Sequence, residues 1–153
     1  MLNVSLIGAV LISLTVIIHT FGLFSLSRLM TAITGTFHLE YSNARKTAAM
    51  IATVLGLFVI HGVEIWIWAV AYVTSGAVAE LPNAIYLSML TFSTLGVSDG
   101  QLDIGGRLLA GLEGVNGFIL IGWSTAYLVA ASQSEALSVR PGARRQSGVA
   151  NGT

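Results

Sequence analysis

The sequence predicts an all-α membrane protein with three spanning helices and one short apolar helix between the second and the third. Of its 153 residues, 54% are hydrophobic and 9% are charged, and the mean hydropathy is +0.81. A soluble domain carries about 25% charged residues, so this chain could not cover a water-exposed surface. Seven basic and seven acidic residues cancel, which argues against nucleic-acid binding and disorder. The absence of cysteine excludes disulfides, thiolate zinc sites and cysteine nucleophiles.

Three apolar stretches are long enough to cross a bilayer, which takes about 20 helical residues. They cover residues 4–27, 47–74 and 107–131. The first stretch resembles a retained helix more than a signal peptide. No Lys or Arg precedes Arg28, the apolar run is too long, and no small-residue cleavage site follows it.

A fourth apolar segment, residues 84–92, is too short to span the membrane as a helix. Pro82 suits the first turn of a helix that continues for about three turns to Phe92 or Ser93. The chain then turns polar and glycine-containing over residues 94–100. Such backbone at membrane depth has to be buried in protein or line water, which is the architecture of a re-entrant pore loop.

The basic residues predict the orientation of the chain. Six of the seven lie in two places, the connection between the first two spans and the C-terminal tail, namely Arg28, Arg45, Lys46, Arg140, Arg144 and Arg145. By the positive-inside rule both places are cytoplasmic, so the N-terminus and residues 75–106 lie outside the cell membrane. We divide the chain into an N-terminal helix with its connection (residues 1–46), a pore module (residues 47–131) and a tail predicted to be disordered (residues 132–153).

Residues 91–99, which follow the short apolar segment, read T-F-S-T-L-G-V-S-D. This motif resembles a pattern near T-x-T-T-V-G-Y-G-D, which is typical of the potassium-channel superfamily. Over residues 50–131 the sequence is similar to the two-helix pore module of that superfamily, close to its small bacterial members. The resemblance continues through residues 107–114 into the third span, and the first span is an addition to the two-helix plan.

The resemblance implies a homotetramer in the lipid membrane that passively conducts monovalent cations, with potassium favoured over sodium. Its filter would be formed by Thr94, Leu95, Gly96, Val97, Ser98 and Asp99, whose carbonyls and threonine hydroxyl replace the hydration shell of the ion. Glycine supplies the left-handed backbone that aligned carbonyls require. Nothing indicates an enzyme, a voltage sensor or a cofactor, and permeant potassium or sodium would be the only bound ions.

Two of the departures from the family pattern bear on ion selectivity. Val97 and Ser98 stand where most potassium-selective members have Tyr and Gly. A non-selective cation channel on the same scaffold is therefore an alternative. A non-conducting structural or regulatory membrane subunit is a second alternative, from another functional class.

Two carboxylates lie within the spans, where a charge is costly unless it is paired, hydrated or protonated. Glu113 and Glu64 either support the filter by hydrogen bonding behind it or bond a neighbouring helix as protonated carboxyls. Thr91 and Ser93, from the filter motif, join them as candidate supports. Tyr72 is interpreted as an interfacial or packing aromatic.

Two histidines also lie within the spans. His19 lies about eight residues and His61 about fifteen from the predicted cytoplasmic ends of their spans, a difference in depth of roughly 10 Å. We therefore expect no shared haem or metal site, and we expect each histidine to hydrogen-bond to a neighbouring helix.

Glycines recur in the third span and allow close helix packing. By analogy with the family, Gly117 or Gly114 could instead act as a gating hinge.

Overall fold

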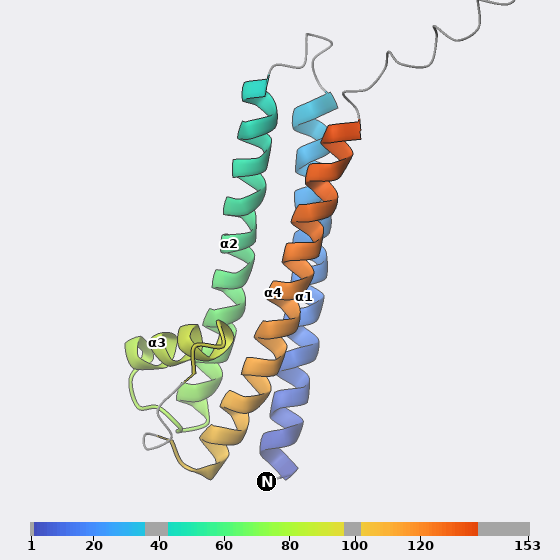
Figure 1. Ribbon diagram of the computed structural model, residues 1–153. Coiled ribbons are helices and arrows are strands. Elements are labelled where there is room, and N and C mark those ends of the chain that lie inside the picture. Colours follow the sequence, from blue (N-terminus) through green and yellow to red (C-terminus); the bar gives the residue numbers. More distant parts are fainter. Residues whose placement is uncertain (1, 36–42, 97–101, 138–153) are drawn as a thin grey trace, which may run out of the picture.

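The chain folds into three long helices and one short one (Figure 1). The computed structural model describes residues 2–35, 43–96 and 102–137. The helices are α1 (Leu2–Gly35), α2 (Asn43–Thr74), α3 (Leu81–Phe92) and α4 (Ile104–Leu137). The described residues contain no strand, so the predicted all-α fold with three long apolar helices is confirmed.

The three long helices are apolar over lengths sufficient to cross a membrane, at Asn3–Ala32, Thr47–Thr74 and Ile104–Gln133. The second agrees with the predicted span. Helix α4 continues to Leu137, so residues 132–137 belong to this helix and not to the predicted disordered tail. Helix α1 continues to Gly35, well beyond its predicted end at residue 27. Polar residues there do not break the helix because their hydroxyls bond to its own backbone. Ser27 Oγ donates to the carbonyl of Leu23 and Thr31 Oγ1 donates to the carbonyl of Ser27, both at 2.9 Å.

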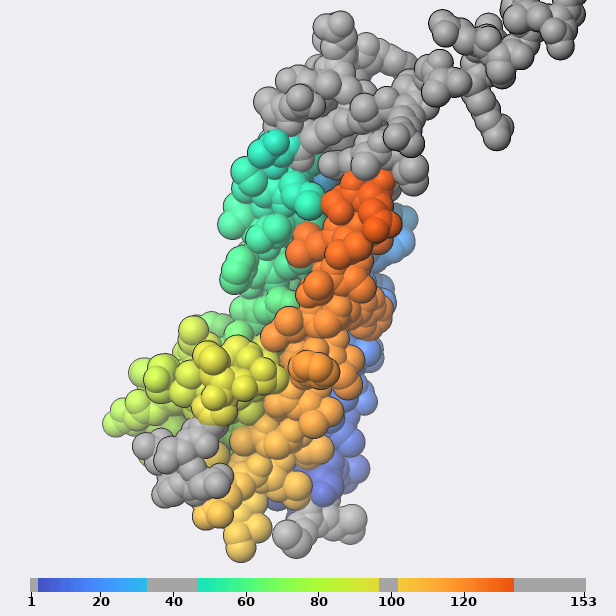
Figure 2. Space-filling model, in the orientation of Figure 1, coloured from blue at the N-terminus to red at the C-terminus, as the bar shows by residue number. Residues whose placement is uncertain are grey.

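The long helices run side by side with alternating direction, and α3 lies across them near the end where α2 finishes and α4 begins (Figure 1). The N-terminus lies at this same end of the bundle. In the space-filling view α3 projects sideways from the bundle (Figure 2). Three crossings therefore place the N-terminus and the connection around α3 on one side of the membrane.

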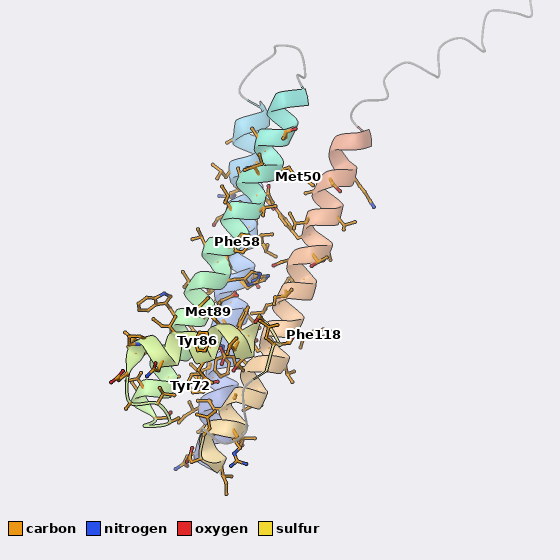
Figure 3. All side chains as sticks on the ribbon, turned by 60° about the vertical axis from the view of Figure 1, so that its left-hand side comes forward. Met50, Phe58, Tyr72, Tyr86, Met89 and Phe118 are labelled. Atoms are coloured by element: carbon orange, nitrogen blue, oxygen red, sulfur yellow. The ribbon has the colours of Figure 1, made fainter. Side chains whose placement is uncertain are left out.

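The main apolar core joins α2, α3 and α4 at the level of α3. It is built from Trp68, Ala69, Tyr72, Ala84, Leu87, Leu102 and Leu109. The outer surfaces of the long helices carry exposed aromatic rings such as Phe58 and Phe118, which are 71% and 70% exposed (Figure 3). In a bilayer, lipid or other copies of the chain cover such surfaces.

Polar contacts fasten α1 to the rest of the bundle. Asn116 Nδ2 donates to Thr15 Oγ1 at 2.9 Å, and the hydroxyls of Ser27 and Tyr127 lie 2.9 Å apart. Both pairs connect α1 with α4. Hydrogen bonds of this kind hold helices together in lipid, where the hydrophobic effect does not drive them to associate.

Candidate functional site

The short helix α3 begins and ends where its sequence predicts. Pro82 occupies the first turn, and Glu80 is the N-cap residue, in extended conformation and without a side-chain capping bond. The last helical residue is Phe92, so the predicted length of about three turns is confirmed. Ser93 follows as the C-cap, and its hydroxyl donates to the carbonyl of Met89 at 2.6 Å.

A left-handed turn ends α3. Thr94 has a φ of 61°, and its N–H donates to the carbonyl of Thr91 at 3.0 Å. The N–H of Leu95 donates to the carbonyl of Leu90, also at 3.0 Å. This pair of bonds is the Schellman arrangement that ordinarily places glycine in the left-handed position. A β-branched threonine in that position stores roughly 1–2 kcal/mol of backbone strain.

The backbone alternates in handedness along the described part of the filter segment. Thr94 and Gly96 have positive φ values of 61° and 87°, whereas Leu95 between them does not. Such alternation is what successive carbonyls need in order to point in the same direction. The Leu95 side chain is 77% exposed. Val97, Ser98 and Asp99 lie outside the described residues, so their place in the filter stays a prediction.

The C-terminal end of α3 rests directly on two glycines of α4. Around Gly117, a Cβ atom would lie 2.9 Å from both the Cα and the carbonyl carbon of Phe92 and would overlap its oxygen. Around Gly114, a Cβ would lie at an ordinary 3.6 Å from the carbonyl oxygen of Thr91. The Thr91 hydroxyl is buried and has no hydrogen-bond partner among the described residues. Close packing thus requires glycine at 117, while the hinge stays a prediction.

A buried carboxyl group connects α4 to α2 and α3. Glu113 is fully buried, and its two oxygens lie 2.5 Å from the hydroxyls of Tyr72 and Ser88. The Ser88 hydroxyl also lies 3.0 Å from the carbonyl oxygen of Ile65. A serine has one hydrogen to donate, so Ser88 satisfies both neighbours only if Glu113 carries a proton and donates it to Ser88 Oγ. These hydrogen bonds hold Ser88 of α3 against both α2 and α4.

The second intramembrane carboxylate lies elsewhere. Glu64 Oε1 is 3.0 Å from Nδ1 of His19, and Oε2 is 2.8 Å from Nδ1 of His61. The opposite ring nitrogen of His61 lies 3.0 Å from Ser124 Oγ. The expected helix-to-helix hydrogen bonds of both histidines are therefore confirmed. A role of Glu64 in supporting the filter stays a prediction, because its hydrogen bonds among the described residues go to histidines.

The predicted difference in depth between the histidines is wrong. His19 lies sixteen residues from the end of α1 at Gly35, and His61 lies eighteen from the start of α2 at Asn43. At 1.5 Å per residue the two depths agree within about 3 Å. The reason is that α1 continues for eight residues beyond its predicted end at residue 27. One ligand atom from each of His19, His61 and Glu64 lies within 4.8 Å of the others.

Three residues of these buried polar groups are not among the site residues that the sequence predicts, namely Tyr72, Ser88 and Ser124. Of the two roles expected of Tyr72, packing is confirmed, because the side chain is fully buried in the main core. Its hydroxyl donates to Glu113. Ser88 could have been found, because it is the only serine within the apolar run of residues 84–92. Nothing local in the sequence indicates the pairing of Ser124 with histidine.

Comparison with known families identifies the family to which the chain belongs. Residues 58–134, half of the sequence, match the model of a family described as an ion channel. The match takes in the second half of α2, all of α3, the filter segment and most of α4. The chain belongs to this ion-channel family, the two-helix channels of the potassium-channel superfamily. Helix α1 precedes the matched region, in agreement with an additional N-terminal helix. No curated protein and no solved structure matched.

The three apolar helices and the family match together identify the chain as a multi-pass membrane protein. Its function is that of an ion channel, and the family is one of channels rather than enzymes.

Proposed function

We propose that four copies of this chain form a pore that conducts monovalent cations passively, with potassium as the preferred ion. The observation that carries the proposal is the left-handed backbone at Thr94 and Gly96, at the end of a short helix that rests midway along α4. Gly117 lies thirteen residues after the start of α4 at Ile104, about 20 Å along its axis. The filter segment therefore begins deep within the membrane.

In a single copy of the chain, the described residues of the filter segment are not covered by other parts of the protein. Thr94, Leu95 and Gly96 are all exposed, and so are the apolar side chains of Tyr86 and Met89 on α3 (Figure 3). Backbone carbonyls cannot face lipid at that depth, because no water is present there to solvate them. Four segments around one axis would give each carbonyl a cation to coordinate and would remove the exposed backbone from lipid.

The end of α3 would add a favourable field. A helix carries about half a negative charge at its C-terminus, and α3 ends next to the filter segment. Four such ends directed at one axis would stabilise a cation there. The acidic residues Glu80 and Asp103, both exposed at the outer connection, would raise the local concentration of cations. We assign the N-terminus and this connection to the outer face of the cell membrane, by the positive-inside rule.

Flux into liposomes tests conduction. Purified protein reconstituted at low density should allow potassium uptake driven by a concentration gradient. Gly96→Ala should abolish uptake, because alanine at a φ of 87° is strained and shifts the carbonyls. Gly76→Ala is the matched control. Gly76 also has a positive φ, 76°, and nothing lies within 4 Å of its Cβ position, but it lies in the connection before α3.

The three functional readings differ in outcome. Potassium uptake far faster than sodium uptake supports the proposed selectivity. Equal uptake of both ions supports a non-selective channel, which the Val97–Ser98 sequence favours. No uptake from the unmodified protein in any lipid, with Gly96→Ala equally silent, supports a non-conducting subunit. Native mass spectrometry of the same preparation should show four copies.

A further inference from the structure

A cluster of three ionisable side chains lies where the additional helix α1 meets the pore module. His19 comes from α1, and His61 and Glu64 come from α2. Both Nδ1 atoms face the Glu64 carboxylate, at 3.0 Å and 2.8 Å. Both Nε2 atoms face one hydroxyl on α4, Ser124 Oγ, at 3.5 Å for His19 and 3.0 Å for His61. The cluster is thus closed at one end by a carboxylate and at the other by a serine.

This arrangement leaves one nitrogen without a hydrogen when both histidines are neutral. Each Nδ1–H would donate to the carboxylate, so each Nε2 would need a donor. Ser124 has a single hydrogen and can donate to only one ring. The second Nε2, fully buried on His19, would remain an unpaired acceptor, which is costly away from water. The cluster would therefore be completed by one additional proton or by a bound cation.

We propose that His19, His61 and Glu64 bind a divalent transition-metal ion of the zinc class. A metal bound by the two Nδ1 atoms and the carboxylate moves both ring hydrogens to Nε2. Ser124 Oγ has two lone pairs and can then accept both N–H groups, so neither buried Nε2 is left unpaired. Metal-bound histidines usually donate their other ring N–H to a hydrogen-bond acceptor, a role that Ser124 Oγ would take here. The inference does not depend on conduction, because the cluster is separate from the filter segment.

The ligand types and their spacing fit such an ion. Two imidazoles and one carboxylate, with a fourth position for water, form a common zinc ligand set. Zinc bonds of about 2.0–2.1 Å in a tetrahedron place ligand atoms about 3.3 Å apart. One ligand atom from each of the three residues already lies within 4.8 Å of the others. Zinc binding therefore requires these atoms to approach one another by at most about 1.5 Å.

The surroundings restrict how the ion enters and how its charge is balanced. The His19 and Glu64 side chains are fully buried, whereas the His61 side chain is 17% exposed and marks the open edge. Glu64 neutralises one charge, and a hydroxide at the fourth position would neutralise the other. Aromatic rings flank the site. Trp123 lies 5.5 Å from the ring of His19, and Phe92, the last residue of α3, lies 5.4 Å from that of His61.

Metal titration of the full chain tests this inference. Tag-free protein in detergent is stripped with a chelator and titrated with zinc chloride by calorimetry, and the bound zinc is counted by elemental analysis. We expect one zinc per chain. His61→Gln and Glu64→Gln should each weaken binding by at least about 100-fold. Ser124→Ala, which removes only the acceptor for Nε2–H, should weaken it by about 10- to 100-fold.

The third histidine provides the matched control. His38→Gln removes one histidine from the chain while leaving all three proposed ligands, so zinc affinity should not change. Cobalt binding to the unmodified protein gives a second readout that needs no variant, since a four-coordinate site produces intense visible absorption. Absence of saturable zinc binding overturns the proposal. So does binding that survives both cluster variants, binding lost in His38→Gln, or a weak six-coordinate cobalt spectrum.

Discussion

Replacing Gly117 by alanine should separate α3 from α4. The alanine Cβ would lie 2.9 Å from the Cα and the carbonyl carbon of Phe92. Carbon atoms attract best at about 3.5–4.0 Å, so one helix has to move by about 1 Å. The neighbour is backbone at the very end of α3 and cannot turn aside as a flexible side chain would. The displacement therefore passes directly to Thr94 and the filter segment.

The expected loss of stability follows from this overlap. Overpacking in a tight interior costs about 1–3 kcal/mol. At about 2–4 °C per kcal/mol for a chain of this size, Gly117→Ala should unfold about 2–12 °C below the unmodified protein. Gly111→Ala is the control, because nothing lies within 4 Å of its Cβ position. It should be neutral or slightly stabilising, since alanine has the higher helix propensity by up to about 1 kcal/mol.

Thermal unfolding in detergent, followed by tryptophan fluorescence, measures the stability of both variants, and potassium flux into liposomes measures their function. Gly117→Ala should lose both stability and flux, while Gly111→Ala should keep both. A pure hinge at Gly117 predicts a different pattern, with unchanged stability and altered flux. If both variants unfold at the temperature of the unmodified protein, the packing argument is refuted.

Three further predictions concern buried polar groups and the strained turn. Glu113→Gln should unfold near the temperature of the unmodified protein, because the amide can still accept from Tyr72 and donate to Ser88. Glu113→Ala should lose about 1–3 kcal/mol, because the Tyr72 hydroxyl is left unpaired while Ser88 still donates to the carbonyl of Ile65. Equal melting temperatures of the alanine variant and the unmodified protein would contradict this account. Asn116 and Thr15 should show a coupling of about 0.6 kcal/mol in a double-mutant cycle to alanine, and zero coupling would mean that their hydrogen bond does not hold α1. Thr94→Gly should relieve roughly 1 kcal/mol of left-handed strain and raise the unfolding temperature while impairing ion flux; a lower unfolding temperature would argue against that strain.

Local signals in the sequence were sufficient to predict the elements of the fold. Apolar runs of the right length indicate the three spans, and Pro82 followed by a polar, glycine-containing stretch indicates α3. These patterns extend over only a few helical turns, so they can be recognised in a single sequence. The end of α1 was the exception, since Ser27 and Thr31 look like a boundary but bond to their own helix.

Contacts between helices were harder to predict, because they depend on rotation and depth that no local pattern encodes. Glu113 was identified as a functional suspect, but its partners Tyr72 and Ser88 lie 41 and 25 residues away in sequence. Helix α1 ends about two turns later than the sequence predicts. That difference alone places His19 and His61 at different depths in the prediction, whereas the structure brings them together with Glu64. A charged or ionisable residue within a span can be predicted to have a partner, but the sequence does not name it.

The reversal potential under bi-ionic conditions tests the proposed function most directly. Purified protein in a planar bilayer is bathed with potassium on one side and an equal concentration of sodium on the other. We predict a cation current whose reversal potential lies well away from zero, with the sign that requires potassium to be the more permeant ion. A reversal potential of zero would contradict potassium selectivity, and the absence of any cation current would contradict conduction through residues 94–96.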